Sequence, residues 1–117
     1  MAGVSVIFFT MPAPAITVED LKARRDRGDA LVLVDVREPF EHAISDLPGS
    51  VKIPLATLPQ SLSKLSPEDE IVVYCRTGGR SAQAVGFLRQ RGFAKSFNLA
   101  GGINLWAERV DPSLPKY

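Results

Sequence analysis

Two continuous apolar runs stand out in the hydrophobic pattern of the chain, at residues 31–34 and 71–74. Neither run alternates with polar positions, which is typical of a parallel strand that is buried on both faces. Shorter apolar segments at residues 51–53 and 97–99 predict two further strands, the first of them closed by Pro54.

Segments with helical features lie between and after these strands. We predict helices or single helical turns at residues 17–27, 38–43, 55–65, 81–91 and 103–110. Thr17 is a suitable N-cap with Asp20 three residues later, and Gly28 and Gly92 end two of the helices. Pro59 must lie near the first turn of its segment. Residues 111–117 contain two prolines, and we expect them to be extended.

The alternation of strands and helices predicts an α/β fold with a mostly parallel central sheet and helices on both faces. We assign a single domain to residues 16–117 and an N-terminal extension to residues 1–15. Ligands of such sheets bind at the carboxyl ends of the strands. Cys75 directly follows the run 71–74, so the thiol lies where this architecture carries its chemistry.

Composition narrows the classes of function. The chain has 117 residues, 45% of them hydrophobic, and a net charge of +1, which suits one soluble globular domain. Basic residues gather between Lys22 and Arg27, but interleaved acidic residues make this a solvated helix face. We therefore expect no nucleic-acid partner and no membrane partner.

A further apolar run, at residues 4–11, lies before the predicted domain. It is too short to span a bilayer, and it lacks the charged start of a secretion signal. We expect an extra edge strand, a subunit contact through Phe8 and Phe9, or a poorly ordered tail. The corresponding expectation for assembly is a monomer or a homodimer.

Cys75 is the one cysteine of this sequence, and His42 is the one histidine. An intrachain disulfide is therefore impossible, and a structural zinc site is nearly excluded, so we expect no metal. A free thiol is compatible with the reducing cytoplasm, where we expect the protein to be located.

The segment from Cys75 to Ser81 carries the candidate chemistry. A strand, a short glycine-containing loop and a helix N-terminus together form an anion cradle around the thiol. Two arginines add positive charge, and such surroundings lower the pKa of a thiol, whose thiolate is the nucleophile. We predict Cys75 as the catalytic residue, with a binding loop of Arg76, Thr77, Gly78, Gly79, Arg80 and Ser81.

Other interpretations of this loop remain open. A buried structural cysteine at a strand end would need the glycines only for the turn. Cysteine phosphatases use a similar cradle with five residues between cysteine and arginine, but only four separate Cys75 from Arg80. The smaller ring should fit one additional sulfur atom better than a tetrahedral oxyanion.

Taken together, these motifs resemble the rhodanese family over residues 16–117. The loop from Cys75 to Arg80 looks like the active loop of that family, and Asp35-Val36-Arg37 looks like its Asp-x-Arg motif. Further similarity lies in Leu47-Pro48-Gly49-Ser50, in Ile53-Pro54, and in Gly101-Gly102 with Trp106. Many members have Gly-His-Ile where this chain has Ser45-Asp46-Leu47, and His42 reads as a surface or supporting residue.

The resemblance implies a sulfurtransferase that carries sulfur as a persulfide on Cys75, with no cofactor. Implied donors are thiosulfate or a cysteine desulfurase, and implied acceptors are a thiol, cyanide or a sulfur-carrier protein. Asp35 and Arg37 would be supporting residues, and Arg80 would anchor the loop through Glu41 or Asp35. The alternative is a non-catalytic rhodanese module that binds a partner.

The tail narrows the resemblance further. Residues 101–117 are similar to the C-terminal rhodanese domain of molybdopterin-synthase adenylyltransferase/sulfurtransferases. The sequence contains no ATP-binding glycine motif, so we expect a stand-alone relative or an excised domain.

Overall fold

A parallel sheet forms the centre of the molecule in the computed structural model, which describes residues 13–117. The expectations for residues 4–11 therefore lie outside the described residues. Within the described part, five strands pair in the order β1-β5-β4-β2-β3, and every pair is parallel. The strands are β1 (Ala15–Ile16), β2 (Leu31–Asp35), β3 (Val51–Lys52), β4 (Glu70–Tyr74) and β5 (Ser96–Leu99). The α/β fold with a parallel central sheet is thereby confirmed.

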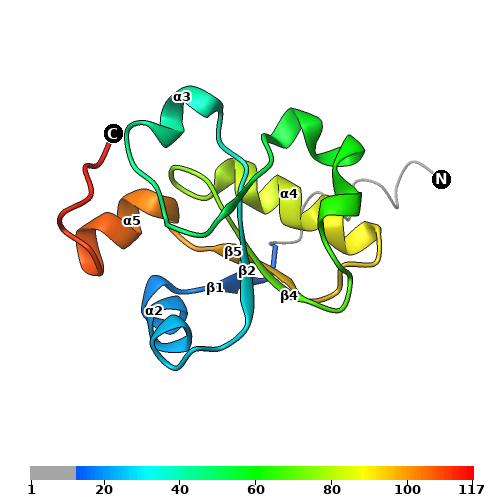
Figure 1. The fold of residues 1–117 in the computed structure, drawn as a ribbon, viewed down its shortest axis with the longest axis horizontal. Coiled ribbons are helices and arrows are strands. Elements are labelled where there is room, and N and C mark those ends of the chain that lie inside the picture. Colours follow the sequence, from blue (N-terminus) through cyan, green and yellow to red (C-terminus); the bar gives the residue numbers. More distant parts are fainter. Residues whose placement is uncertain (1–12) are drawn as a thin grey trace.

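Helices cover both faces of this sheet (Figure 1). One face carries α4 (Gly79–Gln90) with the 3₁₀ helices η1 (Leu55–Gln60) and η2 (Leu62–Lys64), and the other carries α2 (Val18–Asp26) and α5 (Gly102–Arg109). The short helix α3 (Pro39–His42) follows β2. Successive β4 residues pack on opposite faces, Val73 with the α4 cluster and Val72 with the α2–α5 cluster. Burial on both faces explains why the strands read as continuous apolar runs.

Helix α2 confirms its predicted start and its charged surface. Thr17 Oγ1 accepts a hydrogen bond from the Asp20 N–H at 3.0 Å, which satisfies one of the free donors at the helix start. Two basic residues of this helix form ion pairs, Lys22 with Asp26 and Arg24 with Glu70 of β4. The positive charge of the helix is therefore partly matched by acidic side chains.

Residues 55–65 differ from the prediction of one helix. They form two 3₁₀ helices, in which Ser61 N–H donates to Leu58 O and Leu65 N–H donates to Leu62 O, each at 3.0 Å. Pro59 has no N–H and sits inside η1, so a continuous ladder of α-helical bonds cannot form there. Leu58 is nevertheless buried, which explains the apolar spacing of the segment.

Two helix starts and the tail also differ from expectation. Helix α4 begins at Gly79 rather than residue 81, because Gly78 at φ +114° turns the chain directly into the helix. Helix α5 begins at Gly102, one residue earlier than predicted. The tail is not extended throughout, since Leu114 N–H bonds to Asp111 O at 3.1 Å and the segment turns back toward α3 (Figure 1).

The N-terminal end of the described structure contains a strand that the sequence pattern did not reveal. Strand β1 (Ala15–Ile16) pairs with β5, so the boundary assigned between residues 15 and 16 falls inside it. Its two residues are too few to produce a recognisable hydrophobic pattern.

Candidate active site around Cys75

Cys75 lies at the carboxyl end of β4, with 1% of its surface exposed. Its sulfur accepts hydrogen bonds from two backbone donors at the start of α4, the N–H of Gly78 at 3.1 Å and the N–H of Ser81 at 3.5 Å. The hydroxyl of Ser81 lies 3.3 Å from the same sulfur. The loop therefore directs its donors at the thiol, as the sequence predicted for a helix N-terminus beside an anion.

These contacts determine the ionisation of the thiol. Burial by itself raises the pKa of Cys75, but the hydrogen bonds from the Ser81 side chain and from backbone N–H groups of Ser81, Gly78 and Thr77 outweigh it. The net result is a pKa of Cys75 below its ordinary value. A larger share of the thiol is therefore present as the nucleophilic thiolate at neutral pH.

Asn98 on β5, which was not among the predicted site residues, supports this cradle. Its side-chain N–H donates to Gly78 O at 3.2 Å, and its side-chain oxygen accepts the Ser81 hydroxyl at 2.5 Å. The Ser81 proton thus has two acceptors, Asn98 and the sulfur of Cys75. With a neutral thiol, S–H can donate to Ser81 while Ser81 donates to Asn98, whereas a thiolate requires Ser81 to turn its proton to sulfur. The sequence did contain one signal for this role, because Asn98 is a polar residue within a predicted core strand.

Arg80 is anchored by Glu41, which settles the choice between the two carboxylates proposed from the sequence. Two hydrogen bonds, at 2.7 and 2.9 Å, join the guanidinium of Arg80 to the buried carboxylate of Glu41. This bidentate pair lowers the pKa of Glu41 to about 2, against the opposing effect of burial. Arg80 therefore ties α4 to α3, and its charge is largely matched by a carboxylate.

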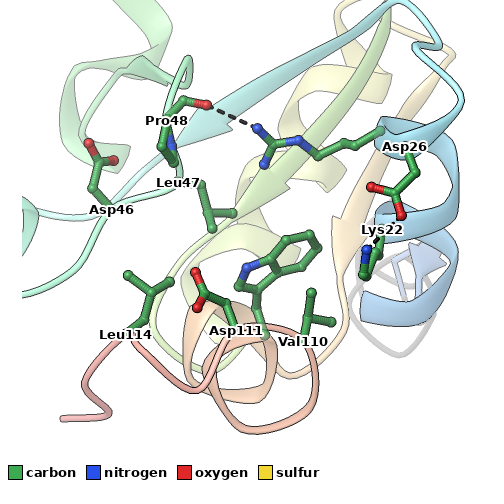
Figure 2. A pocket seen from close by; sticks show the side chains of 10 residues that line it. Lys22, Asp26, Asp46, Leu47, Pro48, Val110, Asp111 and Leu114 are labelled. Atoms are coloured by element: carbon green, nitrogen blue, oxygen red, sulfur yellow. Dashed lines mark hydrogen bonds and ion pairs between the residues drawn. The ribbon is translucent and has the colours of Figure 1, made fainter.

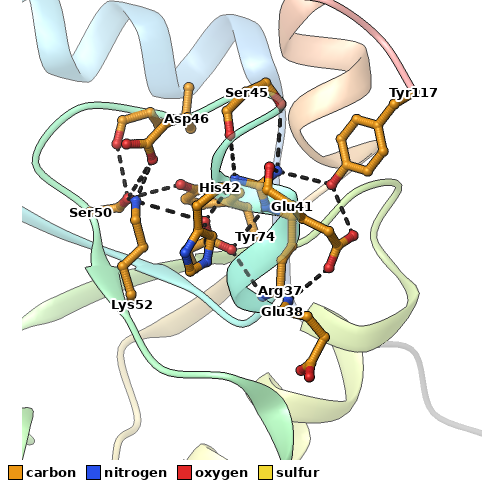
Figure 3. A network of polar contacts seen from close by, with 12 residues as sticks. Arg37, Glu38, Glu41, His42, Ser45, Asp46, Ser50, Lys52, Tyr74 and Tyr117 are labelled. Atoms are coloured by element: carbon orange, nitrogen blue, oxygen red, sulfur yellow. Dashed lines mark hydrogen bonds and ion pairs between the residues drawn. The ribbon is translucent and has the colours of Figure 1, made fainter.

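Asp35 and Arg37 form a fully buried ion pair beneath α3 rather than contacts to the thiol. The Arg37 guanidinium donates to both carboxylate oxygens of Asp35, at 3.0 and 2.8 Å. It also donates to the backbone oxygens of Glu41 and Ser45, at 3.2 and 2.8 Å. The pair thereby fixes the segment that carries Glu41, and Figure 3 shows Arg37 at the centre of this network. His42 lies at its edge, with Nε2 3.5 Å from Asp35.

The Gly101-Gly102 segment, predicted only as part of the family resemblance, brings α5 against the Cys75 loop. Ile103 N–H donates to Cys75 O at 2.9 Å, and Asn104 N–H donates to Arg76 O at 3.1 Å. Gly102 has φ +63°, and a Cβ there would lie 2.6 Å from Cys75 O. Only glycine permits this close approach without moving the backbone.

The remaining loop residues form the outer part of the site. Arg76, Thr77 and Gly79 are exposed, so the predicted loop contains both an inner cradle and an exposed rim. The guanidinium of Arg76 lies 5.1 Å from the ring centre of Tyr117, which was not among the predicted site residues. Tyr117 is 41 residues from Arg76, and no local pattern predicts such a contact.

A separate open hollow of about 370 Å³ lies on the α2–α5 side and excludes the Cys75 loop (Figure 2). Arg25 crosses it, with its guanidinium 5.9 Å from the Trp106 ring centre and donating to Pro48 O at 3.2 Å. Its other lining residues are Lys22, Asp26, Asp46, Leu47, Val110, Asp111 and Leu114, a mixture of both signs of charge that favours no single ligand charge.

Residues 13–117 contain neither a candidate metal site nor a candidate membrane span. No cluster of three or more histidine, cysteine or acidic side chains has the geometry of a metal site. None of the helices in this range combines the length and hydropathy needed to cross a membrane.

A family model matches most of the chain. The model, described as the rhodanese-like domain, covers residues 17–109. The chain belongs to the rhodanese-like family. The resemblance drawn from the Cys75 loop and the accompanying motifs is thereby confirmed.

Three relatives show the range of proteins that carry this domain. The chain is 40% identical over 113 residues to Rhodanese-like/PpiC domain-containing protein 12, chloroplastic, of Arabidopsis thaliana, covering 91% of this chain and 38% of that protein. It is 37% identical over 97 residues to a sulfurtransferase of Allochromatium vinosum, covering 83% of this chain and 91% of that protein. It is 38% identical over 104 residues to the probable adenylyltransferase/sulfurtransferase MoeZ of Mycobacterium tuberculosis, covering 87% of this chain and 26% of that protein.

Solved structures agree with the sequence comparison. The rhodanese-like chain matches the human single-domain sulfurtransferase TSTD1 with a TM-score of 0.76 and 30% identity, over 83% of this chain and 97% of that chain. The likeness to adenylyltransferase/sulfurtransferases is therefore confined to a domain that also occurs nearly alone in other proteins.

Proposed function

We propose that this rhodanese-like chain is a sulfurtransferase that carries sulfane sulfur as a persulfide on Cys75. The observation that carries the proposal is the buried sulfur facing two backbone N–H donors at the start of α4. That arrangement favours an anionic sulfur over a neutral one. The relatives from Allochromatium and human, both named as sulfurtransferases, support it.

The proposed reaction has two steps that balance without an external oxidant or reductant. In the first, the Cys75 thiolate attacks the outer sulfur of thiosulfate, the sulfur–sulfur bond breaks, and sulfite leaves with the electron pair. In the second, an acceptor attacks the outer sulfur of the Cys75 persulfide and the thiolate departs. Cyanide would give thiocyanate, and a thiol would give its own persulfide.

The two loop arginines have different parts in this proposal. Arg80 is paired with the carboxylate of Glu41, so it shapes the loop more than it attracts a donor. Arg76 is exposed and follows Cys75 directly, so its charge is available to an anionic donor. Thiosulfate, with two negative charges, matches this charge better than a neutral donor.

A protein acceptor and a protein donor are the finer parts of the proposal. The name of the mycobacterial relative joins an adenylyltransferase to a sulfurtransferase, a pairing that is consistent with sulfur transfer to an activated carrier. We propose a sulfur-carrier protein as acceptor and a cysteine desulfurase as donor. If the outer sulfur of the Cys75 persulfide attacks an activated carrier C-terminus and displaces the activating group, the product is an acyl disulfide with Cys75. This sequence holds no second thiol, so an external thiol would have to resolve that disulfide. A reducing compartment such as the cytoplasm would supply one.

The test is the intact mass of the protein after incubation with thiosulfate, and again after cyanide, for the wild type and Cys75→Ser. We expect a gain of one sulfur, about 32 Da, on the wild type only, because only a thiolate can attack the donor. Cyanide should remove that mass and release thiocyanate. Uptake from a desulfurase but not from thiosulfate would contradict the choice of donor. Uptake of sulfur from neither donor would overturn the proposed sulfurtransferase activity and favour a partner-binding module.

A further inference from the structure

Arg76 differs from the other loop arginine in having no carboxylate partner among residues 13–117. Its backbone oxygen is bound by Asn104 N–H, but its guanidinium forms no ion pair or hydrogen bond within that range. The guanidinium instead lies against the ring of Tyr117, whose centre is 5.1 Å from the guanidinium carbon. This is the geometry of a cation–π interaction, which orients a positive charge without neutralising it.

Tyr117 is itself held in place by several groups (Figure 3). Arg37 donates to the phenol oxygen at 2.9 Å, and the phenol donates to a Glu41 carboxylate oxygen at 3.0 Å. The backbone N–H of Tyr117 also donates to the side-chain oxygen of Asn104 at 3.2 Å. The phenol oxygen of Tyr117 therefore both donates and accepts a hydrogen bond, and these bonds fix the orientation of the ring.

We infer that Tyr117 is a positioning residue that holds the Arg76 guanidinium at the mouth of the Cys75 loop and so favours anionic reagents. This inference rests on the proposed function for its biological meaning, namely a preference for a sulfur donor carrying two negative charges. Attack of a thiolate on thiosulfate brings three negative charges together, and a cation oriented nearby offsets their repulsion. Glu41, bound to both Tyr117 and Arg80, links this contact to the anchor of the loop.

The decisive experiment compares two alkylating reagents of similar size and different charge. Iodoacetate and iodoacetamide both react by displacement of iodide by the thiolate, and Cys75 is the one thiol of this chain. The ratio of their rates therefore reports the local charge felt by an incoming reagent. Loss of an exposed cation–π contact, by Tyr117→Leu, should lower the ratio of iodoacetate to iodoacetamide about threefold.

Variants separate positioning from a general effect on the fold. Arg76→Gln should lower the ratio at least as much, and Tyr117→Leu added to it should have no further effect. Tyr117→Phe keeps the ring but loses the two phenol hydrogen bonds that fix it, so we expect a ratio between those of the wild type and Tyr117→Leu. Phe87→Leu is the matched control, because the Phe87 ring lies 4.6 Å from the Arg91 guanidinium, a contact outside the Cys75 loop. It should leave the ratio unchanged.

Steady-state kinetics give a second measurement. Tyr117→Leu should raise the KM for thiosulfate about threefold with little change in kcat, and change the KM for the singly charged methanethiosulfonate less. The inference would be overturned if Tyr117→Leu slowed iodoacetate and iodoacetamide equally. It would also be overturned if Tyr117→Leu lowered the rate ratio as much in the Arg76→Gln background as in the wild type. A ratio that changes as expected in a protein that takes up no sulfur would overturn the proposed function and leave the positioning role intact.

Discussion

Gly102→Ala probes the contact between α5 and the loop that carries Cys75. The residue has φ +63°, and an added Cβ would lie 2.6 Å from Cys75 O and would also overlap Arg76 O. Both obstacles are backbone atoms, so no side-chain rotation can relieve them. The contact is also where Ile103 N–H reaches Cys75 O, so a shift there is transmitted to the loop.

The magnitude follows from two contributions. A residue other than glycine in the left-handed region costs roughly 1–2 kcal/mol. Overpacking against atoms that must move adds roughly 1–3 kcal/mol, so we expect a total loss of about 2–5 kcal/mol. Gly28→Ala is the matched control, because Gly28 has φ +79° and nothing lies within 4 Å of its added Cβ. Gly28→Ala should therefore lose only the roughly 1–2 kcal/mol that the left-handed backbone conformation costs.

The assay is urea unfolding, followed by the fluorescence of the single tryptophan, Trp106, together with the rate of Cys75 alkylation by iodoacetamide. We expect Gly102→Ala to be less stable than Gly28→Ala by about 1–3 kcal/mol. We also expect it to slow alkylation, since displacing Cys75 O weakens the hydrogen bonds to its sulfur. Stabilities of the two variants within about 0.5 kcal/mol of each other, a normal experimental spread for independent sites, would refute the reasoning.

Two further predictions concern charge and hydrogen bonding at the site. The Arg80 pair lowers the pKa of Glu41 to about 2 from 4.5, so its stabilisation is complete above pH 4.5 and is lost as the pH falls toward 2. Glu41→Gln should therefore cost about 2 kcal/mol at pH 7 in urea unfolding and less at pH 3.5, and a constant difference would contradict this. Ser81→Ala removes a hydrogen bond that lowers the pKa of Cys75. Alkylation of Cys75 at pH 7 should be about two- to fivefold slower in Ser81→Ala than in the wild type. Ser96→Ala, a serine substitution away from the loop, should leave this alkylation rate unchanged.

Sequence patterns determined the features that depend on neighbouring residues. Continuous apolar runs at residues 31–34 and 71–74 indicated strands buried on both faces, and the sheet contains them as β2 and β4. The loop from Cys75 to Arg80 was recognised because a thiol, glycines and a helix start follow one another directly. The apolar spacing of residues 55–65 was less reliable, since this segment, which contains Pro59, forms two 3₁₀ helices instead of the one predicted helix.

Tertiary structure decided which distant side chains meet. Arg80 pairs with Glu41 rather than Asp35, because Asp35 is already taken by Arg37 beneath α3. Asn98 reaches Ser81 from another strand, and Tyr117 reaches Arg76 from the far end of the sequence. Backbone preference and hydrophobic periodicity act over a few residues, whereas these pairs depend on how elements pack across the sheet. The sequence therefore determined the Cys75 thiol as the candidate nucleophile and the loop around it, and only the folded chain determined the residues that hold the loop in place.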